Sequence, residues 1–290
     1  MKNAVVTGAT GFLGFALLKE LTQNGVFVYA LCRRGSQRLS RLIGLRNVKI
    51  YELDLNYADF TERLEECDVF YHLAWEGGRN DFESQYANVI RAVNSLKIAS
   101  ASGCKRFICT GSQAEYGYTD GAITEDTRLK PATAYGACKA AAYYLTADLA
   151  GRLGIEHTWA RVFSVYGPND APHTLVMKLI SDLANAGEST TDTDGSHIWN
   201  YLYESDAAKA LRLLGETQIT NTVFNIASRE SKPLRAYIEA LRANVNPTSV
   251  VIYGNEKSAV NLDVFPEKLL CSIGEYEATD FTRGIMSICV

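Results

Sequence analysis

The stretch AVVTGATGFLG, residues 4–14, decides the fold of this chain. It begins as an apolar, β-branched strand, passes through three glycines spaced three residues apart, and continues as an amphipathic helix. Gly8 allows an unusual backbone turn, Gly11 lets a phosphate approach the backbone, and Gly14 lets the helix pack closely on the strand. Such a turn offers backbone N–H groups to a pyrophosphate, so the stretch predicts dinucleotide binding. A tight turn with a purely structural role is the alternative.

Apolar runs alternate with longer helical patterns over the first half of the chain. The runs predict strands near 3–7, 26–32, 48–52, 68–74, 105–111 and 155–163. The helical patterns fall near 12–24, 57–66, 83–102 and 134–153. This alternation is typical of βαβ units. We therefore expect an α/β fold, a Rossmann-like doubly wound parallel sheet with helices on both faces.

The pattern changes after residue 163. It predicts a helix near 172–187, a polar stretch at 187–196, a strand at 197–204, a helix from 205, a strand at 223–227 and a helix-rich end. We predict a dinucleotide-binding domain at 1–163, to which 197–230 returns. A smaller C-terminal substrate-binding part would comprise 164–196 and 231–290. Substrate would lie between the two, outside the carboxyl ends of the strands.

Composition limits the partners and the compartment. The chain has 290 residues, 47% hydrophobic and 21% charged, with a formal net charge of −4 and no Lys/Arg-rich run. Nucleic acid and anionic membranes are therefore poor partners. Glycines interrupt the apolar N-terminus, which argues against a secretion signal, and no apolar segment reaches the ~18 residues of a membrane span. The seven cysteines are scattered without a C-x-x-C pair, so we expect reduced thiols, no metal site and a cytoplasmic protein.

The end of the second expected strand bears on the choice of dinucleotide. A carboxylate there would bind the ribose 2′-hydroxyl and disfavour a 2′-phosphate. The strand ends instead in Arg33 and Arg34, and guanidinium groups suit a phosphate. NADP(H) is therefore favoured over NAD(H), unless these arginines are only a solvated strand end. Asp54 and Leu55, after the third strand, are expected to border the adenine, with a helix N-cap as the alternative for Asp54.

Three residues indicate that a proton is moved beside the dinucleotide. Tyr135 and Lys139 lie four residues apart, on one face of an expected helix. A neighbouring ammonium favours the phenolate form, which makes a tyrosine useful for proton transfer near neutral pH. The lysine can also hold the nicotinamide ribose. Ser112 follows an apolar strand, and its hydroxyl can orient a substrate carbonyl or alcohol.

The chain resembles the extended short-chain dehydrogenases/reductases of the NAD-dependent epimerase/dehydratase group, which act on nucleotide sugars. The resemblance covers nearly the whole chain. It rests on TGATGFLG at 7–14, HLA at 72–74, YANV at 86–89, GSQAEYG at 111–117, YGACK at 135–139, RVFSVYGP at 161–168 and NIA at 225–227. In relatives the helices expected at 83–102 and 134–153 pair across a two-fold axis, which implies a homodimer.

The resemblance assigns roles to individual residues. Ser112, Tyr135 and Lys139 match the catalytic serine, tyrosine and lysine, and Asn88 matches an asparagine that supports the active site. Besides the last two catalytic residues, it implies cofactor contacts at Gly8, Thr10, Gly11, Phe12, Leu13, Gly14, Leu73 and Ala74. Cys138 stands where the family commonly has serine, and we expect no catalytic role for it.

Departures from the family pattern bear on the reaction. In the 4,6-dehydratases an acidic pair follows the position of Ser112 and does the elimination chemistry. Here Gln113 and Ala114 stand at those two places, and neither can take or give a proton. Glu115 is displaced by one residue and is expected to face away. Dehydration is thus disfavoured. Ser164 stands where relatives often carry an asparagine that contacts the sugar-nucleotide phosphate.

Hydride transfer to a nucleotide sugar is what remains. We expect NADPH-dependent reduction of a 4-keto-6-deoxy sugar nucleotide. A nucleotide-sugar epimerase with bound NAD and a catalytically silent NADP-binding regulator are the alternatives. Expected substrate contacts are Gln113, Ser164 and His173, although a surface position at a helix start is the alternative for the histidine. Trp75 and Trp199 could border a nucleotide or sugar ring, or belong to the core.

Overall fold

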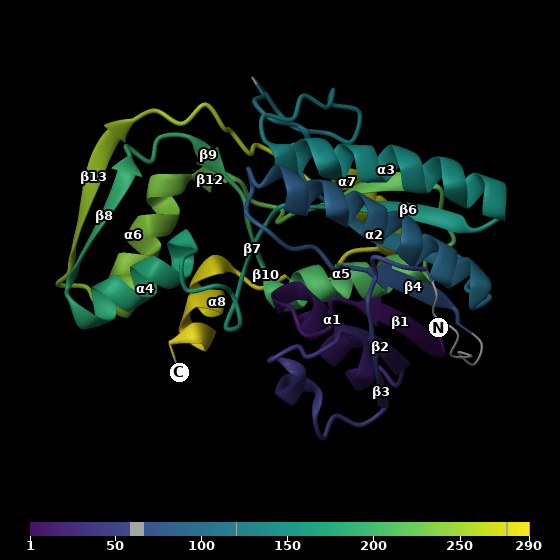
Figure 1. Ribbon diagram of the computed structural model, residues 1–290. Coiled ribbons are helices and arrows are strands. Elements are labelled where there is room, and N and C mark those ends of the chain that lie inside the picture. Colours follow the sequence, from purple (N-terminus) through teal and green to yellow (C-terminus); the bar gives the residue numbers. More distant parts are fainter. Residues whose placement is uncertain (59–66, 120, 277, 290) are drawn as a thin grey trace.

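A seven-stranded parallel sheet forms the centre of the protein (Figure 1). The computed structural model describes residues 1–58, 67–119, 121–276 and 278–289. The strands run in the order β11-β6-β5-β4-β1-β2-β3. Their bounds are β1 Asn3–Thr7, β2 Phe27–Arg33, β3 Val48–Leu53, β4 Val69–His72, β5 Arg106–Ser112, β6 Glu156–Val162 and β11 Thr222–Ile226. The order reverses between β1 and β4, as in a doubly wound sheet. The predicted fold class is confirmed.

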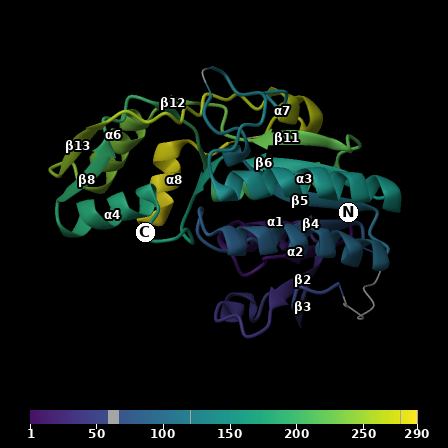
Figure 2. The ribbon, with the colours of Figure 1, turned by 45° about the horizontal axis from the view of Figure 1, so that its top comes forward.

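Helices cover both faces of this sheet (Figures 1 and 2). On one face lie α1 (Phe12–Gln23), α5 (Glu204–Glu216) and α7 (Glu267–Ile273), and on the other α2 (Phe82–Ala101) and α3 (Ala134–Leu153). Leu17 and Leu21 of α1 and Leu211 of α5 are fully buried in one core, and Leu96 of α2 in the other. In the part of the chain that the structure describes, we find no helix with the length and apolar composition to cross a membrane.

A smaller group of elements lies beside the carboxyl ends of the strands (Figure 1). Its helices are α4 (Leu175–Asn185), α6 (Leu234–Val245) and α8 (Phe281–Ile288), with β8 (Glu188–Thr193) parallel to β13 (Val250–Glu256). Two short ladders join it to the sheet: β7 (Ser164–Tyr166) pairs with β10 (Tyr201–Tyr203), and β9 (Ile198–Trp199) with β12 (Lys232–Pro233). Short 3₁₀ turns are formed by η1 (Leu39–Leu42) and η2 (Gln113–Glu115).

Several segments differ from the sequence-based predictions. The polar stretch expected at 187–196 contains strand β8, which is paired with β13. The strand expected at 197–204 is interrupted at the buried Asn200, whose amide group donates to the carbonyls of Ser228 and Glu230. Helix α4 is shorter than expected at both ends. Most of the helix predicted at 57–66 lies outside the described residues, which omit 59–66.

One disulfide corrects the expectation that all cysteines are reduced. Cys67 and Cys104 are bonded to each other, although 37 residues separate them. Cys67 lies just before β4 and Cys104 just before β5. Because these strands are parallel neighbours, their starts meet at the same edge of the sheet, and the two Cα atoms are 4.6 Å apart. No short-range cysteine motif marks this pairing in the sequence.

Candidate functional site

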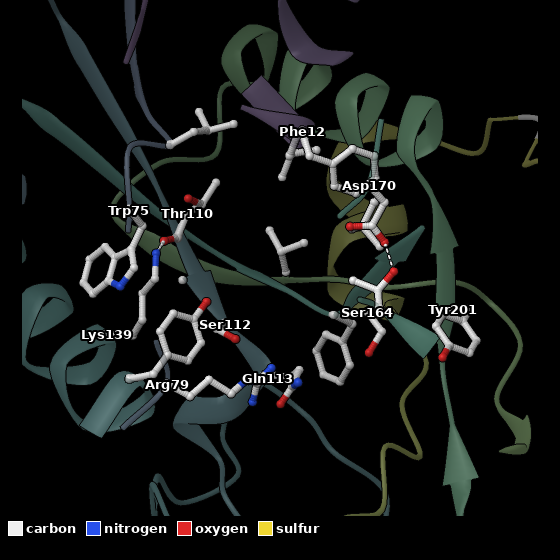
Figure 3. Close-up of a pocket in the computed structure, with 18 of the residues that line it drawn as sticks. Phe12, Trp75, Arg79, Thr110, Ser112, Gln113, Lys139, Ser164, Asp170 and Tyr201 are labelled. Carbon is white, nitrogen blue, oxygen red and sulfur yellow. Dashed lines mark hydrogen bonds between the residues drawn. The ribbon is translucent and has the colours of Figure 1, made fainter. Parts of the chain in front are cut away.

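A cavity of about 390 Å³ lies at the carboxyl ends of the central strands (Figure 3). It is lined from β5, from α3, from the loop after β4, and from the segment between Val162 and Val176. Among the sequence-predicted site residues, the cavity brings together Phe12, Leu13, Leu73, Ser112, Gln113, Tyr135, Lys139 and Ser164. These residues are spread from position 12 to position 164, and the fold brings their separate segments together.

The glycine turn has the shape that a phosphate cradle needs. Gly8 has a φ of +69°, and a Cβ atom there would lie 2.8 Å from the backbone nitrogen of Ala74. A Cβ on Gly14 would overlap the carbonyl oxygen of Gly8. Gly11 is the N-cap of α1, so no side chain covers the first N–H groups of this helix. The turn therefore fits the pyrophosphate of a dinucleotide.

Thr7 fixes the adjoining ends of β1 and β4. Its Oγ1 accepts hydrogen bonds from the backbone N–H groups of Leu73 (3.2 Å) and Ala74 (3.3 Å) and lies 2.9 Å from His72 Nδ1. His72 is fully buried, and this burial, followed by the charge of Lys139, lowers its pKa to about 3. A neutral imidazole can accept the Thr7 hydroxyl proton at Nδ1. The loop after β4 therefore leaves the sheet at a fixed position beside the glycine turn.

Tyr135 and Lys139 project from the first turns of α3 into the cavity. The Thr133 hydroxyl caps this helix by accepting from the Gly136 N–H, and the Tyr135 N–H donates to the Arg79 carbonyl at 2.9 Å. Lys139 is buried, and its Nζ donates to the Thr110 carbonyl at 2.7 Å. The local helix start and the end of β5 thus hold the phenol and the ammonium at one wall of the cavity.

Ser112 ends β5 and caps the short turn η2. Its hydroxyl oxygen accepts from the Ala114 N–H at 3.2 Å, while the hydroxyl proton remains available to a ligand. Gln113 lines the cavity beside it, whereas Ala114 does not. Glu115 points away from the cavity and is fully buried against Arg161. The described residues of the 111–117 motif therefore place no carboxyl group in the cavity.

The far wall of the cavity carries polar residues that the sequence analysis left unassigned. Figure 3 shows Asp170 and Tyr201 there, opposite Lys139, and Arg79 beside Gln113. Burial raises the pKa of Asp170, although its oxygens accept from the Ala171 N–H (2.7 Å) and the Thr174 hydroxyl (2.9 Å). Asp170 lies two residues after Pro168, the end of the RVFSVYGP stretch, and this position could have singled it out. Arg79 and Tyr201 carry no such sequence signal.

Two expected ligand contacts, His173 and Asp54, are not among the residues that line this cavity. His173 is exposed and lies outside the residues that line the cavity. Asp54 is also exposed, and its Oδ1 accepts from the Asn56 N–H at 2.9 Å. This bond is a local turn of the kind that aspartate side chains commonly form. Leu55 is half-buried next to it, and its carbonyl accepts from the Asn94 amide.

The arginines at the end of β2 have charged groups of both signs around them: Arg33 is the last residue of the strand and Arg34 follows it. Arg33 is exposed and forms an ion pair with Glu76 at 2.5 Å, and Glu76 also pairs with Arg91. Arg34 is exposed too. Thr10 of the glycine turn lies 3.4 Å from the Ser36 hydroxyl, and its carbonyl accepts from Arg41. The sequence places no carboxylate near the end of the second strand. In the structure Glu76 reaches this strand end from the loop after β4, so the expectation that no carboxylate lies there is wrong.

Asn88 supports that loop from α2. It is fully buried, its Nδ2 donates to the Glu76 carbonyl at 2.7 Å, and its Oδ1 accepts from the Glu76 N–H at 3.3 Å. An asparagine amide satisfies both backbone groups of one residue in this way. The loop that borders the cavity is thus fixed from beneath by a helix of the sheet domain.

Comparison with known proteins identifies relatives of the chain. Residues 4–227 match the model of the NAD dependent epimerase/dehydratase family. The trifunctional UDP-glucose 4,6-dehydratase/UDP-4-keto-6-deoxy-D-glucose 3,5-epimerase/UDP-4-keto-L-rhamnose-reductase RHM3 of Arabidopsis thaliana is 26% identical, over 98% of this chain and 46% of the plant protein. The chain thus spans about half the length of this relative. The dTDP-6-deoxy-L-talose 4-dehydrogenase (NAD(+)) of Aggregatibacter actinomycetemcomitans is 25% identical, over 84% of this chain and 91% of that enzyme.

Solved structures share the fold over the full length. The UDP-glucose 4-epimerase of Thermotoga maritima, crystallised with UDP-glucose, superposes with a TM-score of 0.87 at 22% identity, covering 99% of this chain and 97% of the other. The UDP-glucuronic acid 4-epimerase of Bacillus cereus, in complex with UDP-glucuronic acid and NAD, gives a TM-score of 0.87 at 21% identity, with 98% and 97% covered. At this identity the likeness shows the fold.

Proposed function

Because the chain belongs to the NAD dependent epimerase/dehydratase family, we propose that it reduces a 4-keto-6-deoxy sugar nucleotide with a nicotinamide dinucleotide. One observation carries the proposal. Ser112, Tyr135 and Lys139 line a single cavity next to the glycine turn, while Glu115 is withdrawn into an ion pair behind it. The site has the groups for hydride and proton transfer, and its serine motif lacks the carboxyl pair of the dehydratases.

The proposed reaction uses three side chains. A bound dinucleotide supplies the hydride that adds to the carbonyl carbon. Tyr135 donates its phenolic proton to the carbonyl oxygen, which becomes the alcohol of the product. Ser112 donates a hydrogen bond to the same oxygen and so holds the carbonyl in place. Lys139, held by the Thr110 carbonyl, places a positive charge beside Tyr135 and offers N–H donors to the ribose.

The relatives support this reaction class. The Aggregatibacter protein is named a 4-dehydrogenase of a 6-deoxy sugar nucleotide, and the Arabidopsis protein includes a keto-sugar reductase among its named activities. In our proposal residues 1–163 with 197–230 bind the dinucleotide, and 164–196 with 231–290 bind the sugar nucleotide. Gln113 and Ser164 lie on the cavity wall where they can contact that substrate.

NADPH is the proposed reductant. Arg33 ends β2 and Arg34 follows it, and Arg41 donates to the carbonyl of Thr10 in the glycine turn. Three guanidinium groups near the end of β2, where the adenosine ribose is expected, suit the charge of a 2′-phosphate. A second candidate, a nucleotide-sugar epimerase that retains NAD, is favoured by one observation: Glu76 already neutralises Arg33.

A substrate screen tests the proposal. The purified chain would be mixed with UDP- and dTDP-linked 4-keto-6-deoxyhexoses and NADPH or NADH, with absorbance at 340 nm as the readout and Tyr135→Phe as the control. We expect NADPH oxidation with formation of the C4 alcohol. Interconversion of UDP-glucose or UDP-glucuronate epimers without net NADPH consumption would overturn the reductase in favour of the epimerase.

A further inference from the structure

Trp75 contacts both members of the tyrosine–lysine pair. The Lys139 Nζ lies 3.7 Å from the centroid of the indole ring, and the Tyr135 ring meets the indole edge-on with centroids 6.2 Å apart. Figure 3 shows the indole beside the lysine side chain on the cavity wall. A cation over the face of an indole is attracted by the ring quadrupole. One side chain, outside the predicted catalytic set, therefore borders the two groups that the reaction needs.

The indole is held in this orientation from α2. Its Nε1–H donates to Gln85 Oε1 at 2.7 Å. Gln85 is fully buried, and its Nε2 donates to the Gly78 carbonyl at 2.9 Å and to the Glu76 carbonyl at 3.3 Å. A tryptophan whose N–H is bonded to a buried, satisfied amide cannot turn its ring without losing that bond. The ring face presented to Lys139 is thus fixed by the fold.

The buried ammonium depends on this ring. Lys139 is 3% exposed, and among the described residues no carboxylate forms an ion pair with it. The Thr110 carbonyl accepts one of its three donors at 2.7 Å. The indole face, at 3.7 Å, is nearer to the ammonium than the Tyr135 ring, at 5.9 Å, and compensates part of the remaining buried charge. This arrangement keeps a further N–H available for a ligand hydroxyl in the cavity.

We propose that Trp75 is a positioning residue that fixes Lys139 and Tyr135 for dinucleotide binding and proton transfer; the inference rests on the function proposed above. Trp75 acts through the lysine and the tyrosine. Its aromatic face, rather than its bulk alone, is the property that matters. An aliphatic side chain of similar reach would leave the ammonium only the more distant Tyr135 ring, whose centroid is 5.9 Å from Nζ, as a π partner.

Dinucleotide binding gives the first test. The affinities of NADP⁺ and NAD⁺ would be measured by calorimetry for the wild type, Trp75→Phe and Trp75→Leu, with Phe265→Leu, an exposed aromatic outside the cavity lining, as the matched control. We expect Trp75→Leu to weaken binding about three- to thirty-fold, the range of a desolvated cation–π contact, and Trp75→Phe to retain most of the affinity. Equal affinity of the leucine variant and the wild type would overturn the inference, as would equal weakening by phenylalanine and leucine.

Measurements of turnover and a second variant distinguish a positioning role of Trp75 from a role in folding alone. With a substrate from the screen, Trp75→Leu should lower kcat and shift its pH profile while KM for the sugar nucleotide changes little, and Trp75→Phe should restore both. Should Trp75→Leu not fold, Gln85→Met releases the indole N–H at nearly constant volume and should weaken dinucleotide binding by a smaller factor. If the wild type binds neither dinucleotide, the proposed function itself fails. If the wild type binds and neither Trp75→Leu nor Gln85→Met differs from it, only the present inference fails.

Discussion

The Glu115 carboxylate and the Arg161 guanidinium form a buried ion pair behind Ser112, with Oε2 and Nε 2.8 Å apart. Their side chains are 0% and 3% exposed. Glu115 Oε1 also accepts from the Ser112 backbone N–H at 2.7 Å and from the Trp159 indole N–H at 3.1 Å. The pair fixes the end of β5 from the side opposite the cavity. A carboxylate that sequence position alone would place near the reaction therefore serves the scaffold.

Removing this carboxylate should destabilise the protein strongly. Glu115→Ala leaves a buried guanidinium without its counter-charge, which typically costs about 3–5 kcal/mol of the free energy of unfolding. Urea denaturation would measure the change. Asp148→Ala is the control, because its pair with Arg152 is exposed and should contribute at most about 0.5 kcal/mol. Similar losses in the free energy of unfolding for the two substitutions would show that the buried pair stabilises the protein no more than the exposed pair.

The proposed proton donor can be tested without disturbing the cavity. Tyr135→Phe removes the hydroxyl and keeps the ring that packs against Trp75. General acids contribute about 10²–10⁴-fold, so kcat should fall by that factor while dinucleotide affinity persists. Lys139→Met should reduce both kcat and affinity, because the lysine has two roles. Near-normal turnover of the phenylalanine variant on a substrate that the wild type reduces would mean that another group supplies the proton.

The sequence predicts those parts of the site that depend on local geometry. The glycine turn follows from residue spacing, and at Gly8 and Gly14 nearby backbone atoms exclude a side chain. Tyr135 and Lys139 follow from helical periodicity, and Ser112 from its place at a strand end. These three signals need no knowledge of distant contacts. They also predict the parallel sheet, because alternating strands and helices restrict the topology to a few choices.

Contacts between distant segments are what the sequence does not reveal. Glu76 reaches Arg33 across 43 residues, and Gln85 orients Trp75 from another element. Strand β8 is polar, so no apolar alternation marks it, and it forms by pairing with β13. The Cys67–Cys104 bond likewise depends on two strand starts that meet only in the sheet. Each of these features is set by tertiary structure, which overrides local propensity.

Acid should destabilise the fold through two buried histidines. Burial lowers the pKa of His157 to about 4, and burial with the charge of Lys139 lowers that of His72 to about 3. In the unfolded chain a histidine titrates near pH ~6.5. Between these values the unfolded state binds more protons than the native state. Stability is therefore full above about pH 6.5 and is lost as the pH falls, by about 3 kcal/mol for His157 alone near pH 4.

Urea unfolding at several values between about pH 7 and pH 4.5 checks this prediction. The slope of the unfolding free energy against pH reflects how many more protons the unfolded state binds than the native state. His157→Asn should reduce this slope by the contribution of one proton, whereas substitution of the exposed His173 by asparagine should leave it unchanged. The comparison of slopes cancels the contribution of other groups, such as the half-buried Asp170 and the buried Glu204 carboxyls, whose raised pKa values act in the opposite direction. Identical slopes for both variants would contradict the assignment.

Cofactor choice should depend on Arg33 and Arg34 at the end of β2. We expect NADPH to bind more tightly than NADH. Arg34→Ala should weaken NADPH binding about ten- to a hundred-fold, the worth of a charge-assisted contact, and leave NADH unaffected. Glu76→Gln should strengthen NADPH binding, because it releases Arg33 from its ion pair. Arg46→Ala, exposed before the start of β3, is the control. NADH binding as tight as NADPH binding in the wild type would reject the preference.

Assembly should use the outer faces of α2 and α3, which lie next to each other on one side of the sheet (Figure 2). Apolar residues of α2 such as Val89 and Leu96 are buried within the chain. The apolar side chains that remain exposed on the two helices include Phe82, Tyr86, Ile90, Tyr144 and Leu145. Exposed apolar side chains on two adjoining helices are typical of an interface, and a two-fold axis would bury them against their own copy.

We therefore expect a homodimer of about twice the 31.9 kDa chain mass in light scattering at micromolar concentration. Leu145→Glu places a charge on the exposed face of α3, within the expected interface, and should yield monomers. Ile252→Glu adds the same charge to an exposed residue of β13, away from these helices, and should leave the dimer intact. A wild type that stays monomeric would contradict the prediction, and a dimer that survives Leu145→Glu but not Ile252→Glu would move the interface to the smaller group of elements.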